Sequence, residues 1–395
     1  MKSKEINVDV DMSGYEIDNR EERLQAGKYM VKLINAVLHG RQPEEIPSGL
    51  SMESVYEAAK RHGMDCIVYE GARKTNTLKK NTHLAAKWEK RNQMCAVQGI
   101  VQQNESKKIC EELPKHGVRV LPMKGCIMKR FYAKQEYRHM TDVDILIDRR
   151  NMKKARKIME NLGYQFTGSE SEDTVDDYIK KPWMIVEMHT YMLPFQYKNH
   201  EKYIDIWDRC TQENGIWHMN WNDFYVFMIE HFAKHFALSG SGIRFVLDIY
   251  VFLEKKGKEL DQDYIKKELK EMGLENFRIK MEKIAYDWFG VESRIGDSKY
   301  ETVTLLAGAF GITEWRYASS QKEYLEKYKV PWLAKSIYVL KRTFPRYHDM
   351  AAQYPFLRHL PFLLPFAWIL RFFRVMFKSR LAMTKEFSAL KKNIK

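Results

Sequence analysis

The run Asp142-Val-Asp-Ile-Leu-Ile147 constrains the fold more than any other segment, because it sets carboxylates among β-branched residues over the length of one strand. In a strand, side chains two residues apart point to the same face. Asp142 and Asp144 would therefore share one face, and the three β-branched residues the other. Two adjacent carboxylates repel each other unless a cation lies between them, and magnesium, which binds carboxylate and phosphate oxygens, is the simplest candidate.

Helical patterns precede this run. Residues 1–20 are polar and lack the apolar stretch of a signal peptide, so we expect a loose leader there. Residues 21–115 should form an N-terminal helical region, in which Ser51 is a suitable N-cap and Gly63 a suitable stop for one helix. A second, long polar–apolar pattern extends from about residue 84 to residue 113.

The pattern changes between residues 116 and 215, which we expect to form an α+β core. Short apolar runs predict strands at 118–123, 142–148, 164–166, 175–179 and 184–189, with helices at 126–132 and 151–162. Helical spacing returns from about residue 222, so 216–345 should form a second helical region, followed by an apolar and basic segment at 346–395. The sequence thus predicts an α+β fold, a small mixed sheet with helices, flanked by helical regions on both sides.

Composition indicates a folded protein in a reducing compartment. The chain has 395 residues, of which 45% are apolar and 30% charged, as in a folded chain of one large domain or several ordinary ones. The five cysteines are widely spaced without a Cys-x-x-Cys pair, which argues against a disulfide scaffold and a zinc knuckle and favours a reducing cytoplasm.

The net charge of +14 is unevenly distributed. From Arg371 to Lys395, eight Lys and Arg residues stand against Glu386 alone, so this tail contributes +7. A basic tail indicates an anionic partner such as a membrane surface, a nucleic acid or an acidic protein. A solvated terminal helix would have the same composition. Polymerase-like nucleic-acid binding is disfavoured, because the charge lies in the tail rather than along an aromatic-studded groove.

Lys124 and Gly125 lie where the predicted strand at 118–123 meets the next helix. A glycine at such a turn lets a phosphate approach the backbone, and the amides at a helix start favour negative charge. The Lys124 ammonium adds a compact positive charge that can bind phosphate. Lys-Gly is a common dipeptide, but its position ahead of Asp142 and Asp144 makes it a candidate phosphate-binding turn.

Glu187 supplies a third carboxylate. It lies in an apolar run, Ile185–His189, where a carboxylate needs a cation or hydrogen-bond donors. The two aspartates could also be solvent-facing acids on a half-exposed strand, but Leu146 shares their face, so that face is not simply polar. Together, Asp142, Asp144 and Glu187 form a candidate three-carboxylate metal site.

This constellation resembles the nucleotidyltransferase superfamily typified by DNA polymerase beta. More narrowly, the chain is similar to a poorly characterised bacterial nucleotidyltransferase family whose pattern is Lys-Gly, a Tyr, Arg-x-x-x-Asp-x-Asp-Leu-Leu and Glu-Leu-His. The matching positions are Lys124-Gly125, Tyr132 or Tyr137, Arg138, Asp142, Asp144, Ile145-Leu146 and Glu187-Met188-His189. The likeness extends to His231-x-x-x-His235, Gly242-Ile-Arg244, Asp248, Phe344-Pro345, Tyr354-Pro355 and Leu364-Pro365 before Arg371.

The resemblance implies a Mg²⁺- or Mn²⁺-dependent enzyme that moves a nucleoside monophosphate from a nucleoside triphosphate, ATP included, to an unknown hydroxyl acceptor and releases pyrophosphate. It implies that Asp142, Asp144 and Glu187 hold metal, with Glu187 also helping to activate the acceptor hydroxyl. It further implies that Lys124, Gly125 and Arg138 hold phosphates. Cys126 departs from the Gly-Ser or Gly-Gly of the broad superfamily, and a thiol is a poor phosphate ligand, so backbone amides and Lys124 must do more of the holding.

Other polar residues are candidates for lining the substrate. His189 shares the face of Glu187 and either orders that carboxylate, contacts substrate or is structural. His231 and His235 are one helical turn apart, which is metal-ligand spacing, but no third ligand completes a zinc motif, so substrate lining or helix packing suits them better. Arg244 either lines the substrate or pairs with Asp248 along a helix.

The C-terminal segment 360–370 is uncharged and contains two prolines, and it falls short of the about 20 residues of a transmembrane helix. The basic and aromatic residues that follow suit a helix lying in the plane of an anionic membrane, which makes 356–395 a candidate contact with the inner membrane face. They equally suit a helix packed on the catalytic unit, and the prolines favour packing. A non-catalytic scaffold with this fold, peripheral to the membrane in envelope-polymer assembly, is the alternative to an enzyme.

Overall fold

The N-terminal region folds into helices whose ends follow local sequence signals. In the computed structural model, the Ser51 hydroxyl accepts a hydrogen bond from the Ser54 amide and Gly63 is left-handed (φ 64°), which confirms the predicted start and stop of this helix. The helices are α1 (Arg20–Leu38), α2 (Met52–His62), α3 (Asp65–Ala72), α4 (Asn76–Lys80) and α5 (Thr82–Lys115). The long α5 contains the pattern predicted between residues 84 and 113.

The chain forms two units, one made of residues 1–10 and 18–311 and the other of residues 11–17 and 312–395. The structure describes residues 5–9, 17–169, 175–194, 197–312, 315–316, 324–325, 327–345, 347, 350, 354–358 and 360–378. Most of the predicted leader at 1–20, and the end of the basic tail at 379–395, therefore lie outside the described residues.

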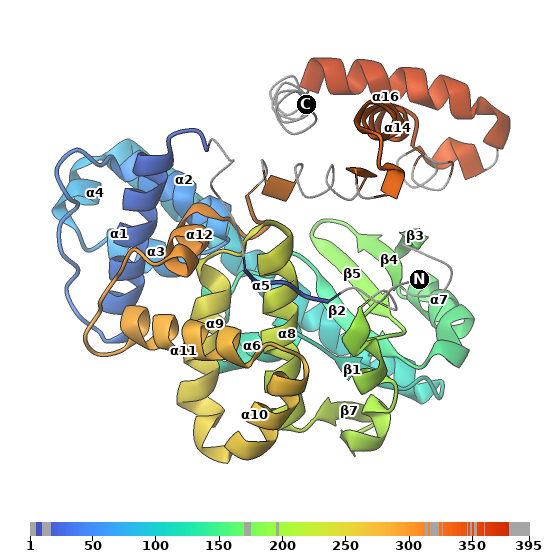
Figure 1. Cartoon of the computed structure of the whole chain (residues 1–395), viewed down its shortest axis with the longest axis horizontal. Helices are drawn as coiled ribbons and strands as arrows, with labels where there is room; N and C mark the ends of the chain where they lie inside the picture. The colour runs from blue at the N-terminus through green and yellow to red at the C-terminus, as the bar shows by residue number, and fades with distance from the viewer. Residues whose placement is uncertain are drawn as a thin grey trace. The chain divides into compact units, whose positions relative to one another are not determined.

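Within the described residues, seven strands form one mixed sheet (Figure 1). They are β1 (Val120–Pro122), β2 (Val143–Ile147), β3 (Gln165–Ser169), β4 (Val175–Lys180), β5 (Met184–His189), β6 (Cys210–Glu213) and β7 (Ile216–Met219). The order is β3-β4-β5-β2-β1-β7-β6; β2 runs parallel to β5 and β1 to β7, and the other neighbours are antiparallel. A mixed sheet with helices agrees with the predicted α+β class.

One face of the sheet is covered by an apolar core. Val143, Ile145 and Ile147 are fully buried in it, as the alternation along β2 predicts. Against this face pack α5 and α7 (Met152–Asn161), through residues such as Ile109 and Ile158. Shorter segments connect the strands: α6 (Gly125–Met128) and the 3₁₀ turns η1 (Lys129–Phe131), η2 (Gln135–Tyr137), η3 (Arg149–Asn151), η4 (Lys198–Tyr203) and η5 (Ile206–Arg209). The opposite face of β2 carries Asp144 and Leu146, both of which are buried.

A second group of helices follows the sheet. These are α8 (Trp221–Ser239), α9 (Ile243–Lys256), the turn η6 (Gly257–Glu259), α10 (Gln262–Glu271), α11 (Glu275–Phe289) and α12 (Lys299–Leu306). Helix α1 packs against α11 and α12, and α11 packs against α9, so helices from before and after the sheet lie in one body (Figure 1).

The fully buried His62 links these two groups of helices. Its Nδ1 accepts a hydrogen bond from the Ile243 amide (3.2 Å) at the start of α9, and its Nε2 lies 3.3 Å from the Leu305 carbonyl oxygen in α12. The ring is therefore the neutral tautomer that carries its proton on Nε2. Burial and the nearby charge of Arg61 hold the pKa of His62 well below its ordinary value of 6.5.

This histidine predicts sensitivity to acid. The pKa of His62 is lower in the folded than in the unfolded chain. Below about pH 6.5, the unfolded chain therefore binds a proton at this histidine and the folded chain does not. We expect His62 to reduce the free energy of unfolding by about 1.4 kcal/mol for each pH unit below about 6.5. Urea unfolding of His62→Gln, whose side chain does not titrate, should show a correspondingly flatter pH dependence down to about pH 5. Equal slopes in the two proteins would contradict this role.

The second unit contains two longer helices, α14 (Pro331–Thr343) and α16 (Leu364–Lys378), with the turns η7 (Pro355–Arg358) and η8 (Pro361–Leu363) between them. Trp368 of α16 donates a hydrogen bond from Nε1 to the Pro345 carbonyl (3.0 Å), and its ring meets the edge of Phe344. Among the described residues, no helix combines the length and the apolar character that crossing a bilayer requires.

Candidate active site

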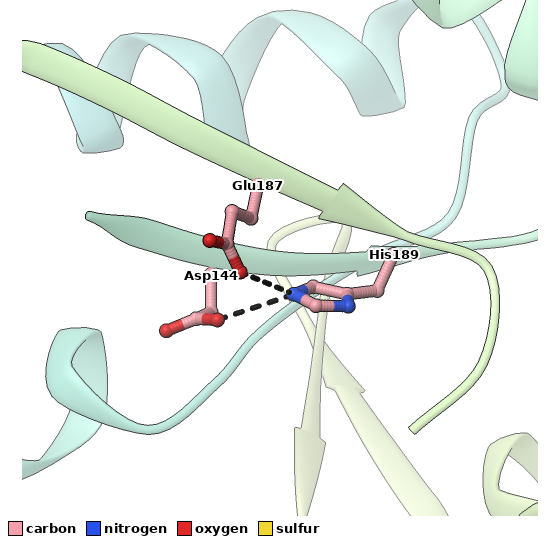
Figure 2. Close-up of side chains that lie close together, drawn as sticks. All are labelled: Asp144, Glu187 and His189. Carbon is pink, nitrogen blue, oxygen red and sulfur yellow. Dashed lines mark hydrogen bonds and ion pairs between the residues drawn. The ribbon is translucent and has the colours of Figure 1, made fainter. Parts of the chain in front are cut away.

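The pairing of β2 with β5 positions the central residues. These parallel strands place Asp144 opposite Glu187 and Leu146 opposite His189. Since alternate residues of β5, Val186 and Met188, are buried in the core, Glu187 and His189 point to the other face. Figure 2 shows the side chains of Asp144, Glu187 and His189 converging on one side of the two strands.

Asp144, Glu187 and His189 form a compact set of ligand-type atoms. His189 Nε2 lies 3.1 Å from Oδ1 of Asp144 and 3.4 Å from Oε2 of Glu187, and the three donor atoms lie within 4.8 Å of one another (Figure 2). Burial alone would lower the pKa of His189, but its hydrogen bonds to the two carboxylates outweigh burial and raise that pKa. Two carboxylates and an imidazole at this spacing fit a divalent cation such as magnesium or manganese.

Lys124 also reaches Asp144. Its Nζ donates a hydrogen bond of 2.6 Å to Oδ1, and the Asp144 side chain is only 6% exposed. Although burial opposes it, the charge of Lys124 keeps the pKa of Asp144 far below its usual range. Lys124 has φ 45° and ψ −113°, in a backbone region that residues other than glycine avoid, and such strain is found where surrounding structure fixes a functional group.

Gly125 follows this strained residue and begins α6. A Cβ atom at this position would lie 2.7 Å from Met140 Sδ and 2.8 Å from Arg138 Nη1, so any other residue would force these two side chains to shift. The requirement for glycine is therefore close packing beneath the turn, whereas the unusual backbone angle falls on Lys124. Burial raises the pKa of the neighbouring Cys126 to about 12, so this thiol stays neutral.

Asp142 lies immediately before β2 and outside the three-residue ligand set. Burial, and then the charges of Asp144 and Glu187, raise the pKa of Asp142 to about 6. A carboxylate whose charged form is disfavoured by two neighbouring carboxylates is one that a cation would stabilise. The predicted carboxylates are thus near enough to one another to interact, and His189 joins them.

Arg138 makes a buried bidentate ion pair with Asp248 of α9. Its Nε lies 3.1 Å from Oδ1 and its Nη2 2.9 Å from Oδ2, and the Tyr132 hydroxyl donates to the same Oδ1 at 2.7 Å. Of the two roles considered for Arg244, the pairing with Asp248 is therefore wrong. Arg244 instead donates from Nη1 to the His139 carbonyl (3.3 Å). The error arose because helical spacing shows which residues share a helix face, but not the competing partner from another segment.

His231 and His235 lie on α8 with their Nε2 atoms 3.0 Å apart. Burial lowers the pKa of both rings, and the charges of Lys234 and Lys124 act in the same direction; together they bring the pKa of His235 to about 3, so both rings are neutral. Among the described residues, no third His, Cys, Asp or Glu joins them at metal-ligand spacing. One ring donates to the other, which leaves a neutral polar pair in the electrostatic range of Lys124.

Two contacts of this region were not expected from the sequence. The ion pair between Lys124 and Asp144 joins residues twenty positions apart, and the pair between Arg138 and Asp248 joins residues 110 positions apart. The alternation along β2 shows that Asp144 faces away from the core but does not show its partner. A buried Asp on the apolar helix α9 was a signal that some cation must lie nearby.

An α+β protein with a candidate divalent-cation site at its central strands is consistent with a nucleotidyltransferase-like fold. A family model described as "Uncharacterised nucleotidyltransferase" matches residues 48–290, more than half of the chain. The chain therefore belongs to this family of uncharacterised nucleotidyltransferases. No curated protein and no solved structure matches it.

Proposed function

We propose that the protein is a metal-dependent nucleotidyltransferase of the bacterial, polymerase-beta-like type, which transfers a nucleoside monophosphate from a triphosphate to a hydroxyl acceptor and releases pyrophosphate. The observation that carries this proposal is the convergence of Asp144, Glu187 and His189 beside the Lys124-Gly125 turn. This arrangement supplies acidic ligands and a phosphate-binding cation at one place, in a member of a nucleotidyltransferase family.

In this proposal, Asp142, Asp144 and Glu187 hold Mg²⁺ or Mn²⁺. A bound divalent cation neutralises charge on phosphate oxygens and makes an attacking hydroxyl more acidic. His189 keeps the Asp144 and Glu187 carboxylates oriented through its contacts of 3.1 and 3.4 Å. Arg138, which is bound to Asp248 through two nitrogens, fixes the turn under Gly125 and thereby positions Lys124 rather than contacting phosphate through those two nitrogens.

The α8 and α9 side of the site supplies the substrate-lining residues of this proposal. Arg244 has a buried Nε without a hydrogen-bond partner, and burial followed by the charge of Arg138 lowers its pKa to about 10. A buried guanidinium with an unpaired N–H is stabilised by an anionic group, so Arg244 favours an anionic substrate group. Neutral His231 and His235 offer a donor and an acceptor for a polar substrate group.

Lys124 distinguishes an enzyme from a scaffold. Its ammonium already neutralises Asp144. In an enzyme, this lysine would move to a phosphate when the triphosphate binds. In a non-catalytic scaffold, it would take the place of the metal permanently. For the enzyme, Lys124→Gln is expected to raise the affinity for Mn²⁺ alone by about tenfold, because a competing cation is gone, and to weaken triphosphate binding by a similar factor. Calorimetric titration measures both.

Lys134→Gln is the matched control, because Lys134 is an exposed lysine that pairs with Glu70 (3.1 Å). It should change neither affinity. If Lys124→Gln bound Mn²⁺ more tightly but left triphosphate binding unchanged, the lysine would be a metal substitute and the scaffold would be favoured.

The reaction itself is tested by incubating the purified protein and Mg²⁺ with each common ribonucleoside triphosphate and cell extract. Mass spectrometry should find one product heavier by a nucleoside monophosphate, and the product should be absent when Asp144→Asn replaces the wild type. Release of a nucleoside diphosphate instead of pyrophosphate, with a product heavier by one phosphoryl group, would show phosphoryl transfer and contradict the proposal.

A further inference from the structure

A stripe of apolar side chains lies on the exposed face of α16. Phe366, Ile369, Leu370 and Phe373, which we call the α16 stripe, are spaced i, i+3, i+4 and i+7, so they lie on one helix face. Their exposed fractions are 52%, 54%, 37% and 51%, and Phe362 in the preceding turn is 73% exposed. Such a continuous apolar surface marks a site of interaction, whereas single exposed apolar residues do not.

The other face of α16 packs within its own unit. Ala367 is fully buried, and Trp368 is held by the Pro345 carbonyl and the Phe344 ring. Figure 1 shows α16 lying across α14. This packing within the second unit uses one face of the helix and leaves the α16 stripe exposed. Packing of the segment on the catalytic unit stays a prediction.

The stripe lies in the most basic part of the chain. Residues 331–395 contain thirteen Lys and Arg residues against two acids, Asp349 and Glu386, a net charge of +11 out of +14 for the whole chain. Both the apolar surface and the charge excess therefore belong to the C-terminal region. The occupant of this surface must offer an apolar phase and negative charge together.

We propose that the α16 stripe docks on an anionic lipid surface, with α16 in the plane of the membrane interface. Phenylalanine, leucine and isoleucine enter the boundary between headgroups and acyl chains, and the lysines and arginines of the sequence 331–395 are attracted to anionic headgroups. A second copy of this chain is disfavoured, because stripe-to-stripe contact would bring two strongly positive surfaces together. A nucleic acid would meet the charge but would leave the aliphatic side chains unused.

Flotation of the full-length protein with vesicles tests this proposal. We expect binding to vesicles of phosphatidylcholine with about 30% phosphatidylglycerol, weak binding to phosphatidylcholine alone, and loss of binding as salt is raised. The double variant Phe366→Glu/Phe373→Glu should reduce the bound fraction about tenfold or more. Val291→Glu, at a valine that is 66% exposed in the other unit, is the matched control and should bind as the wild type does.

Several results would overturn the proposal. They are failure of the intact chain to bind the anionic vesicles, equal binding by the double variant, and concentration-dependent self-association or oligonucleotide retention that the double variant abolishes. Circular dichroism and thermal unfolding of the variants establish that they are folded, and the lipid and salt dependence of the wild type stands independently of any variant. None of these measurements of vesicle binding depends on catalytic activity.

Discussion

Replacing Asp144 by asparagine is expected to lower nucleotidyl transfer about 10³-fold, because metal stabilisation of the transferring phosphate contributes several kcal/mol and each 1.4 kcal/mol is about a factor of ten. The same change should destabilise the metal-free protein by about 2–4 kcal/mol. The reason is that Lys124, which donates to Asp144 at 2.6 Å, loses its counterion in a buried place.

Asp142→Asn is the matched variant, with the same chemistry two residues away. It too should abolish transfer, but in metal-free buffer above about pH 7 it should stabilise the protein by about 1–3 kcal/mol. The pKa of Asp142 is raised to about 6 in the folded protein, so its ionisation at higher pH lowers the free energy of unfolding. Asparagine does not ionise and avoids this loss. Urea unfolding in the presence of a chelator measures both effects. Shifts of the same sign would contradict the charge balance described for this site.

Replacing Asp248 by asparagine is expected to destabilise the protein by about 3–5 kcal/mol, because it leaves the buried guanidinium of Arg138 without a counterion. The Arg138 side chain is only 9% exposed, and both of its contacts with Asp248 would be weakened. Arg138 also lies under the Lys124-Gly125 turn. The folded fraction of the Asp248→Asn protein should therefore bind triphosphate more weakly than the wild type does.

Asp65→Asn provides the control for this prediction. Asp65 is equally buried and pairs with Arg91, but the Arg91 side chain is 37% exposed, so water can solvate it after the change. The loss of unfolding free energy should therefore be about 1 kcal/mol or less. Equal losses in the two variants, measured by urea unfolding, would show that burial of the arginine is not the cause.

Local sequence signals predicted the elements that surround the site. The cap at Ser51, the stop at Gly63 and the alternation along β2 each depend on neighbouring residues, and each is confirmed in the structure. His189 could be placed on the face of Glu187 for the same reason, because residues two apart on a strand point the same way.

The β6–β7 hairpin was missed although the sequence carries a signal for it. Asn214 and Gly215 both have positive φ (50° and 82°), and Asn-Gly is the preferred pair for a tight hairpin turn. The residues before this turn, Thr211–Glu213, are polar and exposed, so no apolar alternation marked the strand. Its place in the sheet depends on pairing of β7 with β1, which is distant in sequence.

The pairings within the site could not be predicted for a related reason. Nothing near Asp248 shows that Arg138 will reach it, because that contact depends on how α9 packs against the sheet region. The register that sets Asp144 beside Glu187 likewise depends on the parallel pairing of β2 and β5, which the sequence of either strand does not encode alone.

Thermal unfolding with triphosphate and Mg²⁺ tests the central claim, that these residues form a metal-dependent nucleotide site, most directly. At about a hundredfold excess of ligand over its Kd, the melting temperature should rise by about 3–8 °C for at least one ribonucleoside triphosphate. The rise should require Mg²⁺ and should vanish in Asp144→Asn. No rise with any triphosphate, or an equal rise in Asp144→Asn, would contradict the account.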